Sequence, residues 1–318
     1  MTRLQLERHQ VWIYLAAIAG GLVLGTSQAG RRDAFELVLW PALVVLLYAT
    51  FVQVPLLQLR EAFADRRFLA AVVTGNFVLV PLLVFAMLQL LPADPAFRLG
   101  VALVLLVPCT DWFIGFAQMG GGDTPRAIAV TPLNLVLQLL LLPLYLWSLP
   151  GAWRSDGLPA ASVVPAVLVV LVPLVAAAIT ARWVDARPSR AWLRERLAWW
   201  PVPLLALVVL LVAASQVATV RAALDVLPVV VPLFAGYLVA AAMIAKVLGS
   251  VFGLPARHGR TLCFSLGTRN SFVVLPLALA LPDGWAVAAV VIVTQSLVEL
   301  LGMLAYLRWV PRLFPAER

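Results

Sequence analysis

Long stretches of apolar residues dominate this sequence and constrain its fold more than any other feature. A helix needs about 20 consecutive apolar residues to cross the hydrocarbon core of a bilayer, and runs of this order recur along the whole chain, separated by short segments that hold charges and turn residues. Apolar residues make up 63% of the chain and charged residues only 12%, whereas soluble domains carry about 25% charged residues. The sequence therefore predicts an all-α polytopic membrane protein and excludes a soluble globular fold.

Apolar runs interrupted by charges predict about ten transmembrane helices. The predicted spans cover residues 11–25, 35–57, 68–91, 97–119, 127–149, 159–184, 199–219, 226–250, 261–281 and 285–307. The first span could also be a cleaved signal peptide, because it has a basic start and ends in small polar residues. Within it, Gly21 and Gly25 form a GxxxG pattern that predicts close helix packing.

The distribution of basic residues predicts the orientation. If the first span is retained, the ten spans cross the membrane in alternating directions. The loops and termini on one side then hold 17 Lys and Arg residues, and those on the other side hold 5. Because basic residues concentrate in cytoplasmic loops, we expect both termini in the cytoplasm and the protein in the cell (inner) membrane. This topology also explains the net charge of +8 without a nucleic-acid partner, since the basic residues form no binding face.

The ten spans divide into two halves of five, residues 1–150 and 151–318. An odd number of spans in each half gives the halves opposite orientations, which is the topology of an inverted repeat. Span 4 contains helix-breaking and polar residues at 108–111, and span 9 contains a polar stretch at 265–270. Broken helices at corresponding places in two halves indicate the binding site of a transporter. We therefore expect helices 4 and 9 to be broken.

Three ionisable residues lie deep in the predicted spans: Asp111, Arg269 and Glu299. Each costs about 2.5–3.5 kcal/mol to insert into a bilayer, so it should face the protein interior and have a partner. We expect Asp111 and Arg269 to form an ion pair. Glu299 is then the candidate proton-coupling residue, because burial favours the protonated form of a carboxylate. The alternative is a structural acid that accepts hydrogen bonds from amides such as Asn270.

Cys109 follows Pro108 in the break of span 4, where a sulfur atom could bind a thiophilic solute. Cys263 is expected only to pack in span 9, and the two cysteines form no CxxC motif. Asn134 and Gln138 are single amides in span 5, where such residues commonly join helices. We expect both histidines to lie in loops, which disfavours an intramembrane enzyme, and we expect no cofactor and no metal site.

Several of these motifs resemble the bile acid/sodium symporter superfamily, and most closely its arsenite efflux permeases. The resemblance rests on residues 75–83, Pro108-Cys109-Thr110, Gly122-Asp123, Asn134, Asn270 and 297–299. It implies ten helices in two inverted repeats, with broken helices 4 and 9 crossing at the substrate site. It also implies that Cys109 and Glu299 are essential. The substrate-binding residues expected from the motifs and the ionisable positions together are Cys109, Thr110, Asp111, Arg269, Asn270, Asn134 and Asn76.

The sequence also departs from the family. The sodium-coupled branch has a glutamate near Ser265 and an amide where Arg269 stands, and a guanidinium in that place repels a cation. The arsenite branch lacks an acid at Asp111, has asparagine at the position of Arg269, and has an acid near Phe272. The chain is therefore similar to a divergent member, for which sodium coupling is disfavoured.

These observations lead to two functional hypotheses. The first is a secondary transporter that exports arsenite or antimonite in exchange for protons. The alternative is a transporter of an organic anion, with Arg269 as the counter-ion of a substrate carboxylate. Either way, the expected partners are a small anion or metalloid and the lipid bilayer.

Overall fold

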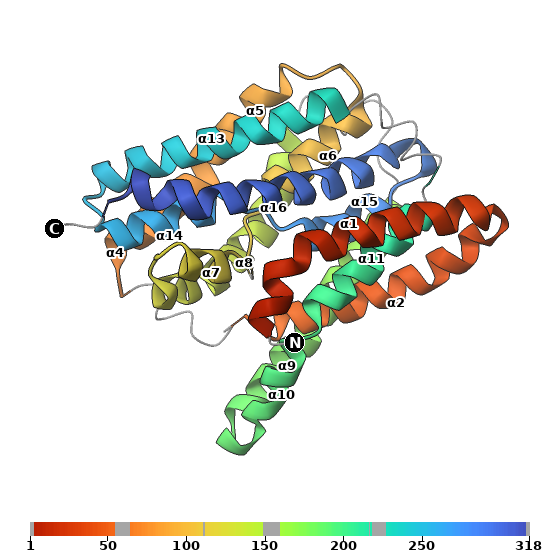
Figure 1. Cartoon of the computed structure of the whole chain (residues 1–318), viewed down its shortest axis with the longest axis horizontal. Helices are drawn as coiled ribbons and strands as arrows, with labels where there is room; N and C mark the ends of the chain where they lie inside the picture. The colour runs from red at the N-terminus through yellow and green to blue at the C-terminus, as the bar shows by residue number, and fades with distance from the viewer. Residues whose placement is uncertain are drawn as a thin grey trace. The chain divides into compact units, whose positions relative to one another are not determined.

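The computed structural model describes residues 3–54, 64–110, 112–148, 160–215, 217 and 227–315. These residues form helices and short turns (Figure 1). Within them, the only pairing of extended backbone is an isolated antiparallel bridge between Pro108 and Arg269. The chain divides into two compact units, each of which draws on both halves of the sequence. The assignment of residues 1–150 and 151–318 to two inverted repeats stays a prediction.

The first unit comprises Met1–Gln53, Pro159–Val226 and Pro276–Val290. Its helices are α1 (Arg3–Ser27), α2 (Arg32–Phe51), α9 (Ala160–Asp185), α10 (Ala191–Leu197) and α11 (Pro201–Ser215), with short 3-10 turns η1 (Ala29–Arg31), η4 (Pro188–Arg190) and η6 (Asp283–Trp285). Here α11 packs against α1 and α2, and α2 packs against α9. In Figure 1, α1, α2 and α11 lie side by side.

The GxxxG pattern in α1 brings this helix close to α11, as predicted. A Cβ atom added at Gly21 would lie 2.3 Å from the carbonyl oxygen of Leu210, and one added at Gly25 would lie 2.3 Å from that of Ala214. Both distances are far below van der Waals contact, so only glycine permits this approach of the two backbones.

The second unit comprises Val54–Leu158, Leu227–Leu275 and Val291–Arg318. It contains α4 (Arg66–Thr74), the π-helical turn η3 (Gly75–Leu79), α5 (Val80–Leu88), α6 (Pro95–Leu105), α7 (Trp112–Met119), α8 (Thr124–Ser148), α13 (Leu227–Val251) and α14 (Ala256–Gly267). Helices α15 (Ser271–Leu279) and α16 (Val287–Leu313) have residues in both units. Two helix starts follow the sequence rules: Asp65 caps α4 and Asp94 caps α6, each accepting a backbone N–H three residues later at 3.0 Å.

Seven helical stretches among the described residues are long and apolar enough to cross a membrane: Arg32–Phe51, Arg66–Leu88, Thr124–Ser148, Leu168–Asp185, Ala191–Ser215, Leu227–Val251 and Val287–Leu313. They match the predicted spans 2, 3, 5, 6, 7, 8 and 10. Span 1 corresponds to the shorter apolar stretch Trp12–Ser27 of α1. Spans 4 and 9 are each divided into two short helices, α6 with α7 and α14 with α15. The protein is therefore an all-α polytopic membrane protein with the two broken helices that the sequence predicted.

Candidate functional site

The two helix breaks pair with each other in the second unit. The break between α6 and α7 lies against the break between α14 and α15, and the two extended segments run antiparallel. The N–H of Cys109 donates to the carbonyl of Thr268 at 3.2 Å, and the N–H of Asn270 donates to the carbonyl of Val107 at 2.8 Å. The Asn270 amide also donates to the Thr110 hydroxyl at 3.0 Å. The expected crossing of the broken helices is thus held by backbone and side-chain hydrogen bonds.

Local sequence explains why both helices stop here. Pro108 has no N–H to continue α6, and it disfavours the helical conformation of Val107 before it. In the other helix, α14 ends at Gly267 and Thr268 is extended, with φ −104° and ψ 139°. A Cβ atom at Gly267 would lie 2.6 Å from the Tyr306 ring, so glycine allows the end of α14 to pack closely against α16.

The side chain of Arg269 is fully buried in an oxygen-lined cradle beside this crossing. Its Nη2 donates to the Asn76 side-chain oxygen at 2.8 Å and to the carbonyls of Ser265 and Leu266 at 2.9 and 2.7 Å. Its Nη1 donates to the Leu105 carbonyl at 3.3 Å. Each of these four acceptors is a neutral oxygen.

The cradle exists because α14 ends inside the protein. The last carbonyls of a helix have no intrahelical donor, and they carry the negative end of the helix dipole. At membrane depth no bulk water can satisfy them. Arg269 donates to two of these carbonyls, those of Ser265 and Leu266. The Tyr237 hydroxyl also donates to the Leu266 carbonyl, at 2.6 Å. The Tyr237 ring centroid is 5.6 Å from the guanidinium carbon, within the range of a cation–π contact.

Glu299 lies next to this cradle on α16 and is 1% exposed. Its Oε2 accepts the backbone N–H of Arg269 at 2.8 Å and the Gln295 amide at 2.6 Å. The Gln295 oxygen in turn accepts the Ser271 hydroxyl at 3.0 Å. The carboxylate is therefore tied to the break in span 9 through neutral donors. We call Arg269, Glu299, Gln295 and Asn76 with these bonds the crossing network.

Asn76 enters the crossing network from a π-helical turn, η3. Its side-chain nitrogen donates to the Ser265 hydroxyl at 3.1 Å while its oxygen accepts Arg269. One residue later, the Phe77 carbonyl accepts the Tyr145 hydroxyl of α8 at 2.6 Å. Single π-helical turns inside α-helices are frequent at functional sites, so this turn supports the choice of Asn76 as a site residue.

The structure brings most of the predicted site residues to the crossing: Cys109, Thr110, Arg269, Asn270, Asn76 and Glu299. Asn134 is fully buried in the neighbouring helix α8. Asp111 lies outside the described residues, so its pairing with Arg269 stays a prediction. The sequence alternative expected the Asn270 amide to donate to Glu299, whereas it donates to Thr110.

Sequence reasoning missed four contributors to the site: Ser265 as a hydrogen-bonding partner, Tyr237, Ser271 and Gln295. Gln295 had a detectable signal, because it lies four residues before Glu299 and so on the same face of a helix. The other three contribute single hydroxyl or carbonyl groups that many membrane helices contain, and only their packing identifies them.

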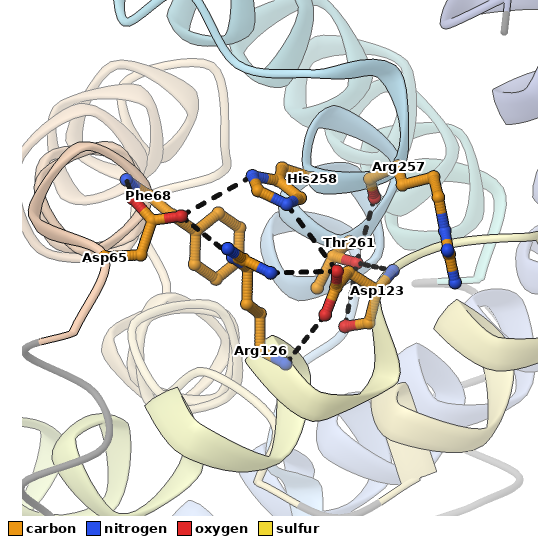
Figure 2. Close-up of polar contacts among 7 residues, drawn as sticks. All are labelled: Asp65, Phe68, Asp123, Arg126, Arg257, His258 and Thr261. Carbon is orange, nitrogen blue, oxygen red and sulfur yellow. Dashed lines mark hydrogen bonds and ion pairs between the residues drawn. The ribbon is translucent and has the colours of Figure 1, made fainter.

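A second charged group lies at the helix ends, and we call it the loop cluster: Asp65, Asp123, Arg126, His258 and Thr261 (Figure 2). Arg126 donates to Asp65 at 2.8 Å and to Asp123 at 3.0 Å. The two nitrogens of His258 lie 3.6 and 3.5 Å from the same two carboxylates. The Asp123 N–H donates to the Thr261 hydroxyl at 2.6 Å.

The pKa values of His258 and Asp65 in the loop cluster are both shifted. Burial lowers the pKa of His258, and the nearby Arg126 lowers it further, although the two carboxylates act in the opposite direction. Burial by itself raises the pKa of Asp65, but the Phe68 N–H and Arg126 outweigh it and the net pKa is lowered. The cluster joins Asp65 and Asp123 to residues of α8 and α14, so His258 lies in a helix and not in a loop as the sequence predicted. These are the ends of spans that the basic-residue count placed on one side of the membrane. Their contact agrees with that alternation of spans.

Comparisons with known proteins fit this architecture. A model of the Sodium Bile acid symporter family matches residues 40–223, more than half of the 318 residues. The chain is also similar to the arsenical-resistance protein Acr3 of Corynebacterium glutamicum, with 25% identity over 337 residues that cover 96% of this chain and 90% of the relative. Together with the apolar helices and the paired helix breaks, the family match classifies the protein. The chain belongs to the Sodium Bile acid symporter family of membrane transporters.

Proposed function

We propose that this transporter exports trivalent arsenic or antimony, with Cys109 as the substrate ligand and Glu299 as the proton-coupling residue. The observation that carries the proposal is the position of Cys109 in the paired helix breaks, where its N–H bonds the residue before Arg269. Thiolates are the protein ligands that soft, thiophilic elements prefer. The likeness to an arsenical-resistance protein over 96% of the chain supports the same substrate.

The chemistry at Cys109 balances without any further reactant. Trivalent arsenic exists near neutral pH as an uncharged hydroxide. Binding forms one arsenic–sulfur bond and breaks one arsenic–oxygen bond, and the thiol proton leaves with the hydroxide as water. Release reverses this exchange on the other side of the membrane. No oxidation or reduction takes place, as expected for transport.

The hydrogen bonds around Arg269 argue against an organic anion as the substrate and against sodium as the coupling ion. A substrate carboxylate needs a guanidinium whose N–H groups face it, but the terminal nitrogens of Arg269 already donate to four neutral oxygens of the protein. A small cation would need the same oxygens. The guanidinium of Arg269 therefore occupies the place that a bound cation would take in this cradle. Neither an organic anion nor a sodium ion is favoured there.

Glu299 is suited to carry the exchanged proton. It is buried beside the crossing, so its protonation is coupled to the groups that pair the two broken helices. A proton on Glu299 weakens its hydrogen bond from the Arg269 N–H, because a charged acceptor makes the stronger bond. Protonation would thereby loosen the contact between α16 and the break in span 9, as alternating access requires.

The test compares two buried cysteines that form no disulfide, Cys109 and Cys263. Arsenite tolerance and arsenite uptake into everted vesicles are measured in a host that lacks its own arsenite exporter. We expect Cys109→Ser to abolish transport while the protein remains in the membrane, and Cys263→Ser to transport as the wild type does. Normal transport by Cys109→Ser would refute the assignment of the ligand.

A further inference from the structure

Two amide side chains on α8 are buried without a hydrogen bond from the protein. Asn134 is 0% exposed and Gln138 is 1% exposed. Within the part of the chain that the structure describes, neither the nitrogen nor the oxygen of either amide has a hydrogen-bond partner. Buried polar groups are nearly always hydrogen-bonded, and each exception needs an explanation such as a bound ligand.

Other buried amides of the second unit do have partners. Asn76 bonds Arg269 and Ser265. Asn270 donates to Thr110, and Gln295 accepts from Ser271. The same packing that satisfies these amides leaves four polar atoms unsatisfied on one helix. Among these buried amides of the second unit, the unsatisfied atoms therefore lie on α8.

The two amides share the buried face of α8. They are four residues apart, so one lies directly above the other. The opposite face of the helix exposes Val136, Leu140 and Leu144, which are suited to contact lipid. The buried face belongs to a helix that packs against α6, α7, α14 and η3. These elements carry the paired helix breaks and Asn76.

An amide differs from a charged side chain in what it recognises. It offers N–H donors and a carbonyl acceptor in one group. An anion contacts only donors of the protein, and a cation contacts only its acceptors. A hydroxyl group both donates and accepts, so it can use both groups of an amide. Two stacked amides with no protein partner therefore match an uncharged ligand with two hydroxyl groups.

We propose that Asn134 and Gln138 bind the hydroxyl groups of a neutral, hydroxylated substrate. This inference rests on the proposed function and deepens it. A trivalent hydroxide bound to a single thiolate keeps two hydroxyl groups, one for each amide. Cys109 then selects the element, and the α8 amides select its uncharged hydroxylated form over an anion.

The experiment replaces each amide with an apolar side chain of similar shape, in Asn134→Leu and Gln138→Met. Leu140→Ala on the exposed face of the same helix is the control for changes in α8. Thermal unfolding is measured in detergent, and uptake into everted vesicles is measured for arsenite and for methylarsenite. Methylarsenite keeps only one hydroxyl group once a thiolate is bound.

We expect the unfolding temperatures of both amide variants to equal or exceed that of the wild type, because no protein hydrogen bond is lost. Arsenite uptake should fall at least about tenfold, the loss expected when a buried hydrogen bond to a ligand is removed. Uptake of methylarsenite should fall less. Asn76→Leu, which removes real hydrogen bonds, should instead lower the unfolding temperature.

Wild-type arsenite uptake by both amide variants would overturn the inference, and the amides would then be bridged by structural water. Equal losses for the two substrates would also overturn it, because recognition would not depend on hydroxyl groups. If the wild type itself moved no metalloid, the proposed function would fail and this inference with it. That outcome is visible in the wild type before any variant is compared.

Discussion

The crossing network and the loop cluster both hold opposite charges in the second unit, but they stabilise those charges differently. In the loop cluster, Arg126 and His258 lie directly against the carboxylates of Asp65 and Asp123. In the crossing network, the terminal nitrogens of Arg269 bond neutral oxygens, and neutral N–H groups donate to one oxygen of Glu299. The described hydrogen bonds of Arg126 join it to two carboxylates, whereas the described hydrogen bonds of Arg269 and Glu299 join them to neutral dipoles.

The difference follows from where each network lies. At the helix ends the side chains are partly exposed, so direct pairs form in a medium that weakens their attraction. Inside the membrane the interrupted helices supply free carbonyl and N–H groups, which replace water around a charge. The broken helices thus provide both the crossing and its solvation.

Replacing Arg269 should have the largest effect. Arg269→Met removes a donor from the carbonyls of Leu105, Ser265 and Leu266, of which that of Leu266 still accepts from Tyr237, and each buried carbonyl left unsatisfied costs about 1–3 kcal/mol. We expect a loss of more than about 3 kcal/mol in the free energy of unfolding and no transport. The loss of stability is measured by thermal unfolding in detergent. Arg269→Lys should recover part of the stability, and an unfolding temperature unchanged in Arg269→Met would show that the cradle is not stabilised by the guanidinium.

Replacing Glu299 should affect coupling more than stability. Glu299→Gln keeps an oxygen that can accept the Arg269 N–H, so we expect a stability loss of only about 1–2 kcal/mol. The uncharged amide cannot carry a proton. In vesicles with an imposed pH gradient, wild-type transport should follow the gradient, whereas the variant should lose this response and keep some downhill exchange. A variant that still follows the gradient would exclude Glu299 as the coupling residue.

Replacing Arg126 should cost less than replacing Arg269, although Arg126 makes two ion pairs. Its side chain is 37% exposed, so solvent screens both pairs and we expect Arg126→Gln to lose about 1 kcal/mol of stability. The loss should shrink further at high salt, because ions screen exposed pairs. Unfolding measured at low and high ionic strength checks this. A loss as large as that of Arg269→Met would remove the distinction between the two networks.

The smallest expected effect is the pH dependence at His258. Its pKa is lowered in the folded protein, chiefly by burial, so the unfolded chain binds the proton more tightly. The stabilisation is therefore present above pH 6.5, the usual pKa of histidine, and is lost as the pH falls below it. As the pH is lowered from about 7.5 to 5.5, the unfolding temperature of the wild type should decline, and that of His258→Gln should decline less. Parallel curves would show that His258 does not contribute.

The sequence by itself determined the membrane class, most of the spans and the places where two of them break. These properties are local: apolar length decides whether a helix can cross the bilayer, and Pro108 and Gly267 stop helices wherever the chain places them. The cost of placing a charge in lipid also predicted that Arg269 and Glu299 face the protein interior, and both are buried there. Close packing at Gly21 and Gly25 was predictable for the same reason, since a short motif produces it.

Only the tertiary structure decided which groups the buried charges contact. The pairing of Arg269 with Asp111 stays a prediction, but its described contacts, an amide and three backbone carbonyls, were not predicted. Any residue can supply a carbonyl, so such a partner leaves no trace in the sequence. The loop cluster was equally hidden, because Asp65, Asp123 and His258 lie far apart along the chain and meet only when the helices pack. Local chemistry determines where a polar group is needed, and long-range packing determines which group provides it.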